Sequence, residues 1–415
     1  MKDYLKNFLT HGNSKTLLSA FLYFDVSFMV WVLLGGLGNF IAEDMGLSGT
    51  EKGLMTSLPV LSGAALRLPM GMAADRFGGR RVGMIGLAVT LIPLLAAWSI
   101  ADTLPLILVV ALLLGVAGSS FAVALPLASR WYPPEQQGLA LGIAGAGNSG
   151  TVLASLFAPR LAELVGWHTV FLLATVPVLA VFVLFSLWAK DSPTTVAPPR
   201  FSEYLGALRH RDTVWFCAFY GVTFGGFVGL ASYLAIYFRD QYGLTKVEAG
   251  DLTALCVFAG SFARPIGGML ADRLGGIRIL FVLYSIVGLT MAGISLGPAL
   301  AVSVALFFTS MAVLGAGNGT VFQLVPQRFQ REMGVLTGLV GAAGGLGGFL
   351  LPFLLGSIED ATGSYSAGFL IFSAACFGVA TLLLVAQRGW EQTWAPKGSP
   401  ARSGRSAMVA AGDQA

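Results

Sequence analysis

Apolar stretches of about 20 residues alternate with short polar segments along most of the 415-residue chain. A hydrophobic run of this length can cross the hydrocarbon core of a bilayer as one α-helix. The pattern therefore predicts twelve membrane-spanning helices, and we expect an all-α membrane protein. The helices are placed at about 15–41, 53–73, 82–101, 105–129, 138–160, 167–189, 214–238, 248–271, 277–297, 299–326, 333–357 and 366–387.

A polar stretch divides the twelve helices into two sets of six. Residues 190–213 contain three prolines and four basic residues, and we expect them to form a cytoplasmic linker. The linker would join an N-terminal half, residues 1–189, to a C-terminal half, residues 214–387. Residues 388–415 are polar and rich in small side chains, so we expect a disordered cytoplasmic tail.

Basic residues are distributed unevenly between the two sides of the predicted membrane protein. Of the 25 lysines and arginines, 19 fall on the side of the linker and the termini, and two lie within spans. The other side keeps only four, Lys52, Arg160, Arg239 and Lys246. Cytoplasmic loops carry the excess of Lys and Arg. We therefore expect a multi-pass protein of the cell (inner) membrane with both termini cytoplasmic.

The overall composition agrees with a membrane protein. The chain is 55% hydrophobic and 11% charged, whereas soluble domains carry about 25% charged residues. A net charge of +4 gives no reason to expect a nucleic-acid partner. Cys217, Cys256 and Cys376 lie in apolar spans without metal-ligand spacing, which predicts buried thiols, no disulfide framework, no metal and no cofactor. The polar N-terminal segment does not resemble a cleaved signal peptide.

Two arginines lie well inside hydrophobic spans and occupy the same position of an internal repeat. Arg67 begins the pattern Arg-x3-Gly-x3-Asp-Arg-x-Gly-Gly, and Arg264 begins it again 197 residues later. The repeat continues as Leu-Gly in the fourth and tenth spans, and as three glycines shared by the fifth and eleventh. A repeat of six helices in the same orientation predicts two pseudo-symmetric halves.

A buried guanidinium is costly in a membrane and is usually kept for a function. Arg67 lies about eight residues, or roughly 12 Å, inside its helix, and Arg264 has the same depth by symmetry. Asp25 is the one carboxylate well inside a span, and one acid cannot neutralise both arginines. We therefore expect the arginines to bind a small monovalent anion, for which the planar guanidinium fork is suited. A structural ion pair with a buried carboxylate is the alternative.

Glycine-rich strings form a second group of candidate residues. The fifth helix carries Gly145, Gly147 and Gly150, and the eleventh carries Gly344, Gly345, Gly347 and Gly348. Such glycines usually allow close helix packing. Asn148 and Asn318 are embedded in similar strings, and their amides could donate to an anion without adding charge.

The loop pattern Asp-Arg-x-Gly-Gly resembles the cytoplasmic loop motif of the major facilitator superfamily, and its recurrence covers both halves. The resemblance implies the twelve-helix major facilitator fold. It also implies that Asp75, Arg76, Asp272 and Arg273 form a gating latch. Turn formation by Gly78 and Gly79 alone is the other reading of this loop.

The strings around Asn148 and Asn318, the glycines of the eleventh helix and the two arginines together resemble the nitrate/nitrite porter family of that superfamily. The resemblance implies that Arg67 and Arg264 clamp nitrate or nitrite. It further implies that Tyr220 donates a hydroxyl hydrogen bond, that Phe121 and Phe224 sandwich the anion, and that Asn148 contributes to the site. Helix packing is the alternative role for each aromatic residue.

Asp25 bears on how transport is driven. The string Phe24-Asp25-Val-Ser looks like the nitrate/proton symporter branch of the family, which implies that Asp25 carries a proton. A permanently ionised partner for an arginine, or a capping group, is the alternative.

The sequence as a whole predicts a monomeric secondary transporter that imports nitrate, and also nitrite, by alternating access with proton symport. Its partners would be the anion, protons and the lipid bilayer. Nitrate/nitrite antiport is the nearest alternative, followed by a carrier for another small anion, an exporter of drugs or sugars, and an anion sensor. The chain shows no nucleophile–base pair or phosphate loop, so we expect no enzyme.

Overall fold

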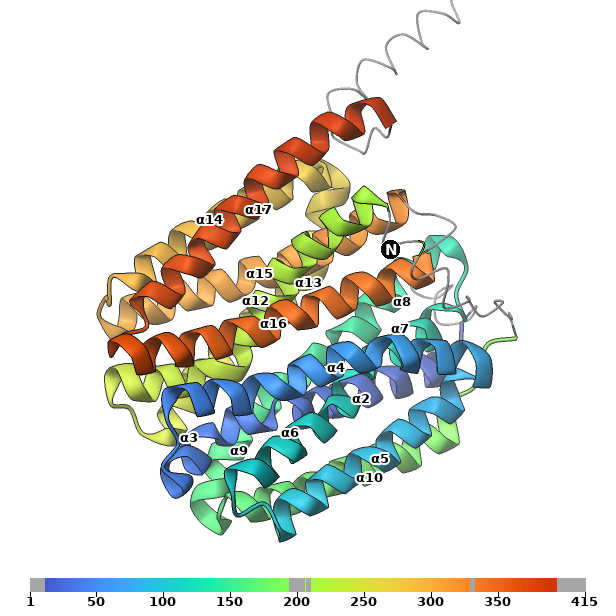
Figure 1. The fold of residues 1–415 in the computed structure, drawn as a ribbon. Helices are drawn as coiled ribbons and strands as arrows, with labels where there is room; N and C mark the ends of the chain where they lie inside the picture. The colour runs from blue at the N-terminus through green and yellow to red at the C-terminus, as the bar shows by residue number, and fades with distance from the viewer. Residues whose placement is uncertain (1–11, 194–205, 207–209, 329–332, 394–415) are drawn as a thin grey trace, which may run out of the picture.

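Twelve long helical segments make up the computed structural model, which describes residues 12–193, 206, 210–328 and 333–393 (Figure 1). In the first half they are α2 (Ser14–Trp31) with α3 (Leu33–Met45), α4 (Gly49–Phe77), α5 (Gly79–Ser99), α6 (Leu104–Gly118) with α7 (Phe121–Ser129), α8 (Pro134–Gly145) with the 3-10 turn η1 (Ala146–Ser149) and α9 (Gly150–Val165), and α10 (Trp167–Trp188). In the second half they are α12 (Arg211–Tyr242), α13 (Lys246–Leu274), α14 (Gly276–Ser295), α15 (Leu300–Arg328), α16 (Met333–Thr362) and α17 (Ser366–Thr393).

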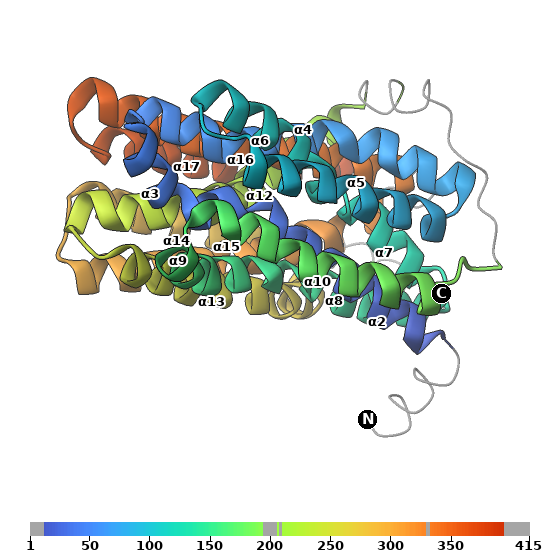
Figure 2. The same ribbon diagram turned by 90° about the horizontal axis from the view of Figure 1, so that it is seen from below.

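The two halves lie side by side, and helices from both halves pack against each other along the boundary. In Figure 1 the blue to green helices of the first half fill the lower part, and the yellow-green to red helices of the second half fill the upper part. The most extensive contacts between them join α4 to α16, α9 to α13, and α3 to α12, and smaller contacts join α13 to η1 and α3, and α4 to α12. Figure 2 shows the helices running lengthwise through both halves. The predicted arrangement of two six-helix halves is therefore confirmed.

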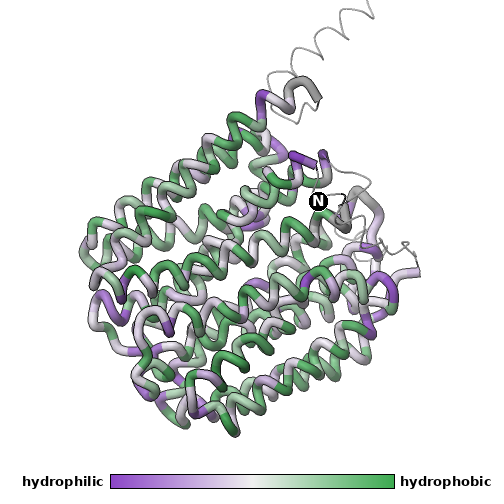
Figure 3. The backbone as a smooth tube through the Cα atoms, in the orientation of Figure 1, coloured by the Kyte–Doolittle hydropathy of each residue, from purple (hydrophilic) through white to green (hydrophobic). Residues whose placement is uncertain are grey.

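Eleven of the described segments are long and apolar enough to cross a membrane. The remaining one, α4, has 29 residues but carries charged side chains at both ends and Arg67 in between. Apolar residues dominate the middle of the bundle, and polar residues collect at its two ends (Figure 3). Large side chains such as Ile92, Leu179 and Leu289 are exposed on the outside. An apolar belt of this kind suits contact with lipid, and the chain is a multi-pass membrane protein.

The two arginine-bearing helices begin and end in the same way. Helix α4 starts with a capping box between Ser48 and Glu51, and α13 starts with the same box between Thr245 and Glu248. The box satisfies free backbone N–H groups at a helix start. Gly78 and Gly275 end these helices with φ angles of 91° and 94°, a region that glycine adopts readily. The repeat thus fixes where both helices begin and end, and with that the depth of both arginines.

One end of the bundle, called here the linker end, holds the start of α2, the end of α10 and the start of α12. The Thr16 side chain joins α2 to the end of α10, by donating to Trp188 O and accepting from Lys190 N. Asp191 accepts from the backbone N–H of Arg80 at the α4–α5 turn. The other end, where α3 and α16 finish, is called the opposite end.

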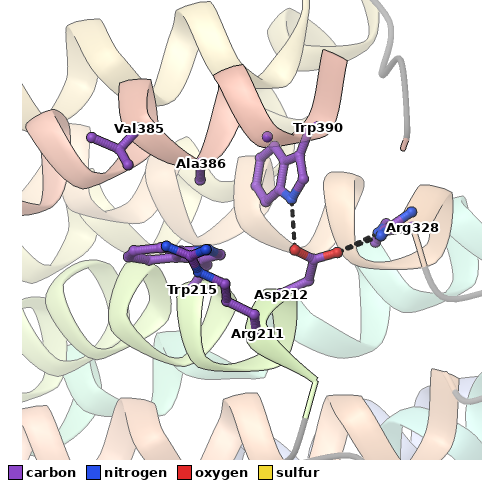
Figure 4. Close-up of a pocket in the computed structure, with 8 residues that line it drawn as sticks. Arg211, Asp212, Trp215, Arg328, Val385, Ala386 and Trp390 are labelled. Carbon is purple, nitrogen blue, oxygen red and sulfur yellow. Dashed lines mark hydrogen bonds and ion pairs between the residues drawn. The ribbon is translucent and has the colours of Figure 1, made fainter. Parts of the chain in front are cut away.

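The last helix continues further than the sequence predicts. Residues 388–393, which we expected to begin a disordered tail, form the final turns of α17, and residues 394–415 lie outside the described part of the chain. Trp390 explains the extension, because its side chain is buried and donates to Asp212 at 2.8 Å. Asp212 also pairs with Arg328 at 2.5 Å, beside a pocket of about 250 Å³ (Figure 4). These contacts fasten α17 to α12 and α15.

Candidate functional site

The two repeat arginines meet at the boundary between the halves. Arg67 on α4 is 1% exposed, and Arg264 on α13 is half-buried. Their guanidinium carbons lie 5.1 and 5.8 Å from the centre of the Phe121 ring. The two cations are also close enough to repel each other. The fold therefore places two like charges, one from each half, around one aromatic side chain.

Neither arginine has an acidic partner in the described part of the chain, where no carboxylate oxygen lies within 4 Å of either guanidinium. Arg67 Nη1 donates to Gly341 O at 2.5 Å, and Arg67 Nε donates to Gly118 O at 3.5 Å. Arg67 Nη2 and Arg264 Nη1 are buried without a hydrogen-bond partner among the described residues. A buried donor of this kind is normally satisfied, so the site has two guanidinium nitrogens whose N–H groups are available to an acceptor.

Aromatic rings enclose the two guanidinium groups. Tyr220 and Phe224 stack in parallel on α12, with ring centres 5.0 Å apart and planes inclined by 9°. Arg67 lies 4.8 Å from the Phe224 ring centre and 5.7 Å from that of Trp31. Cation–π attraction offsets part of the cost of burying the charge. The three aromatic residues that the sequence suggested, Phe121, Tyr220 and Phe224, thus all lie beside Arg67 or the ring that it shares with Arg264.

The Tyr220 hydroxyl is aimed into the same space. It is buried and interacts electrostatically with both arginines, yet it makes no hydrogen bond of normal geometry within the described residues. Asn148 Oδ1 and Asn318 Oδ1 are also buried and unpaired there. Several polar atoms near the half-to-half boundary therefore have no partner in this part of the protein.

Phe322 is a site residue that the sequence reasoning missed. Its ring lies edge-on to Tyr220 at 4.8 Å, 6.0 Å from Phe121, and 5.8 Å from the guanidinium carbon of Arg264. The internal repeat points to this part of α15, but one position away from Phe322. Helices α6–α7 and α15 repeat with an offset of 200 residues, which aligns Phe121 with Val321 rather than with Phe322. The two phenylalanines are therefore partners in space that are one position apart in the repeat.

Each arginine also contacts a glycine from the other half, and the two glycines are repeat equivalents. The Cα of Gly341 on α16 faces Arg67, because a Cβ added there would lie 3.5 Å from Arg67 Nη1. A Cβ added to Gly145 at the end of α8 would lie 3.9 Å from Arg264 Cζ. The glycine strings thus border the arginine pair from both sides.

The other glycines of these strings bring helices into contact. Added Cβ atoms at Gly147 and Gly150 would overlap α2 at Phe24 and Asp25. On α16 the same test meets Tyr220 at Gly344, Ala64 at Gly345, Gly221 at Gly347 and Val228 at Gly348. Close approach of this kind needs residues without a side chain. The glycines of α16 therefore let α4 and α12 pack on its two sides.

Asp25 lies in the middle of α2 and is half-buried. Its Oδ1 accepts a hydrogen bond from Ser149 Oγ at 2.6 Å. In the described part of the chain no Lys, Arg or His nitrogen lies within 4 Å of its carboxylate. Asp25 is thus an acid inside the bundle that is held by a hydroxyl and forms no ion pair with a described residue.

The profile of the Major Facilitator Superfamily matches residues 19–352. The chain is 36% identical to the nitrite extrusion protein of Bacillus subtilis over 369 residues, which cover 88% of this chain and 92% of that one. The chain belongs to the nitrate/nitrite porter family of the major facilitator superfamily. It is also 35% identical to the probable nitrate/nitrite antiporter NarK1 of Thermus thermophilus, with coverage of 82% and 84%.

Solved structures support the same fold. A bacterial homologue of the human lysosomal transporter Spinster, crystallised in an inward-facing and occupied conformation, superposes with a TM-score of 0.69. The match covers 90% of this chain and 97% of that one at 20% identity. Membership of the major facilitator superfamily makes the protein a membrane transporter and not an enzyme.

The superfamily loop residues lie at the linker end. Asp75 and Asp272 belong to the last turns of α4 and α13 rather than to the loops that follow. Asp75 pairs with Arg130 at 2.5 Å, whereas Asp272 accepts from the side-chain amide of Gln323 at 2.8 Å. Arg76 lies over Phe77, and Arg273 is exposed. Both aspartates therefore hold helices of their own half together.

Ion pairs at the opposite end instead connect the two halves of the porter. Arg160 on α9 forms a bidentate pair with Asp251 on α13, at 2.5 and 2.8 Å. Further pairs between the halves join Lys52 to Asp240, and Glu43 to both Arg239 and Lys246, each at 2.8 Å, whereas His168 and Asp102 pair within the first half. Asp360 on α16 accepts from the backbone N–H groups that start α4. The opposite end is therefore closed by polar contacts between the halves.

Proposed function

We propose that this porter imports nitrate, and also nitrite, through the site formed by Arg67 and Arg264. The observation that carries the proposal is the convergence of two guanidinium groups, one per half, without an acidic partner in the described residues. A bound anion would satisfy the donors that have no partner there. The relatives named for nitrate and nitrite transport support this choice of anion.

The shape of the site favours a small planar anion. The parallel rings of Tyr220 and Phe224, together with Phe121 and Phe322, present flat surfaces. Guanidinium groups supply parallel N–H donors that match a planar oxyanion. With Asp25 ionised, the charges of Arg67, Arg264 and Asp25 sum to +1, which one monovalent anion neutralises. Labelled nitrate uptake into proteoliposomes, competed with nitrite, a sugar and a lipophilic drug, tests the proposal. Of these three compounds, only nitrite is expected to reduce the uptake of labelled nitrate.

Replacing Tyr220 by phenylalanine is expected to raise the KM for nitrate about tenfold, because one hydrogen bond to a charged group is lost. The stacking on Phe224 would remain. Uptake rates measured over a range of nitrate concentrations check the effect. Tyr284→Phe is the matched control, since the Tyr284 hydroxyl donates to Phe219 O instead of facing the arginines. An unchanged KM in Tyr220→Phe would remove the hydroxyl from the substrate site.

Transport would proceed by alternating access, with a proton carried on Asp25. Anion import against a negative interior potential needs a driving force, and proton symport supplies one. The excess of basic residues at the linker end supports a cytoplasmic location for that end and both termini, in an inner-membrane monomer surrounded by lipid. As the halves rock, Asp75, Arg76, Asp272 and Arg273 would form the latch at this end, through contacts made in addition to those of Asp75 and Asp272 within their own halves.

Asp25→Asn is expected to abolish nitrate-driven acidification of the proteoliposome lumen, because an amide cannot carry the proton. Exchange of labelled for unlabelled nitrate across the membrane is expected to continue. A pH-sensitive dye in the lumen measures the acidification, and Asp102→Asn, at an exposed carboxylate of the opposite end, is the control. Acidification that persists in Asp25→Asn would exclude Asp25 as the proton site.

Nitrate/nitrite antiport is the second candidate, favoured by the Thermus thermophilus relative that is named an antiporter. Antiport predicts that nitrite inside the vesicles stimulates nitrate uptake without acidification of the lumen. The same dye measurement therefore separates the two modes.

A further inference from the structure

The fifth spanning segment changes its helix type at one place. Helix α8 ends at Gly145, the 3-10 turn η1 occupies Ala146–Ser149, and α9 resumes at Gly150. A short 3-10 stretch inside a longer helix often marks a hinge, because its hydrogen bonds are poorer than those of an α-helix. The two flanking glycines add backbone freedom. The turn is therefore a place where this segment can change shape.

One side of η1 rests directly on Asp25. Ser149 Oγ donates to Asp25 Oδ1 at 2.6 Å. A Cβ added to Gly147 or Gly150 would overlap the backbone of α2 at this same residue. Hydrogen bonds to an ionised acceptor are about twice as strong as neutral ones. An ionised Asp25 thus holds the turn firmly against α2.

The other side of the same turn faces the second half of the protein. The backbone carbonyl of Asn148 accepts from Ser261 Oγ at 3.5 Å. Ser261 precedes Arg264 by three residues on α13, and Gly145 borders the Arg264 guanidinium. The turn therefore contacts both the acid on α2 and the helix that carries one substrate arginine.

Within the described residues, no second charged residue lies near the middle of α2 or of the elements that pack against it. Helix α2 packs against α3, α5, α6, α7, α8, η1, α9 and α10. Helices α6 and α7 and the turn η1 contain no charged residue. The charged residues of the remaining elements lie towards the ends of the bundle, and they are Glu43 and Asp44 of α3, Arg80 and Arg81 of α5, Glu135 of α8, Arg160 and Glu163 of α9, and His168 of α10.

We propose that Ser149 is a positioning residue that links the protonation of Asp25 to the arginine pair through η1. This inference rests on the proposed role of Asp25 as the proton carrier. When Asp25 takes up a proton, its oxygen becomes a weaker acceptor for the Ser149 hydroxyl. The turn is then released from α2, and its contact with Ser261 shifts, together with the packing of the adjoining Gly145 beside Arg264. When the proton leaves, the carboxylate again accepts a strong hydrogen bond from Ser149, which holds the turn against α2.

The test compares Ser149→Thr with Ser149→Val, because the two side chains have the same shape and differ in the hydroxyl. Each purified variant is reconstituted in proteoliposomes. The KM for nitrate is measured from mildly acidic to mildly alkaline pH, and nitrate exchange is measured without a pH gradient. Ser155→Val on α9 is the control, since the Ser155 hydroxyl bonds only to its own helix, at Thr151 O. Asp25→Asn is measured in parallel.

Ser149→Val is expected to keep nitrate exchange within about twofold of the unsubstituted protein and to lose the pH dependence of KM, while Ser149→Thr retains both. Normal pH dependence in Ser149→Val overturns the inference. If Asp25→Asn lacks that dependence in the same experiment, the proton role of Asp25 stands without Ser149. Loss of both exchange and pH dependence in Ser149→Val and Ser149→Thr alike also overturns it, because the hydroxyl is then not the deciding group.

Discussion

Replacing Arg67 by lysine is expected to reduce nitrate uptake about a hundredfold or more, at an unchanged amount of folded protein. Lysine keeps the positive charge but loses the planar fork that reaches Gly341 O and Gly118 O. It also loses the position of the guanidinium over the Phe224 and Phe121 rings. A compact ammonium offers one point charge in place of two directed N–H groups.

Arg278→Lys is the matched control for this substitution, because Arg278 is an exposed residue on α14. Uptake of labelled nitrate and thermal stability of the purified protein are measured for both variants. A stable Arg67→Lys variant that transports nitrate normally would contradict the anion clamp. It would favour a carrier of the same fold for another class of substrate, in which Arg67 has only a structural role.

The fold could be predicted because hydrophobic length and repeat spacing are local properties of the sequence. The offset of 197 residues between Arg67 and Arg264 also relates the capping boxes at Ser48 and Thr245. Helix start and residue spacing together determine depth in the membrane. Two arginines at equal depth in symmetric halves must therefore lie at similar heights in the bundle.

Other parts of the site depend on packing that no single helix reveals. Phe322 was not predicted from the sequence because the repeat that relates the halves is approximate. A shift of one position separates it from the repeat equivalent of Phe121. Ser149 was not predicted because its hydrogen bond to Asp25 depends on how η1 packs against α2. The extension of α17 depends on a hydrogen bond between Trp390 and Asp212, which are far apart in sequence.

The ion pairs show a similar limit of sequence reasoning. All four basic residues on the predicted outer side, Lys52, Arg160, Arg239 and Lys246, pair with acidic residues of the other half. From the sequence, these residues served only to predict the orientation of the protein in the membrane. Their positions in space show that they also hold the halves together at the opposite end, where exposed pairs contribute modestly one by one and more as a network.

The second large effect is expected from Gly356→Val, because α4 and α16 pack closely at the opposite end. Gly356 lies on α16 against Gly49 of α4, and a Cβ there would overlap the Gly49 carbonyl oxygen. Four residues earlier on α16, the Pro352 carbonyl lies against Gly53 in the same way. Backbone atoms cannot move aside as a flexible side chain can. The closed arrangement of this end should therefore be strongly disfavoured in the variant.

Nitrate uptake by Gly356→Val is expected to fall about ten- to a hundredfold, because overpacking disfavours the closed state that the proposed alternating-access cycle passes through. Gly378→Val is the control, since no atom lies within 4 Å of an added Cβ there. A cysteine at Val60, which packs against Gly345 and Gly348 in the closed state, should react faster with a membrane-impermeant thiol reagent in the variant once Cys217, Cys256 and Cys376 are replaced. Normal uptake with slow labelling would mean that α4 and α16 need not come together during transport. Loss of uptake with slow labelling would trace the defect to a step other than closure.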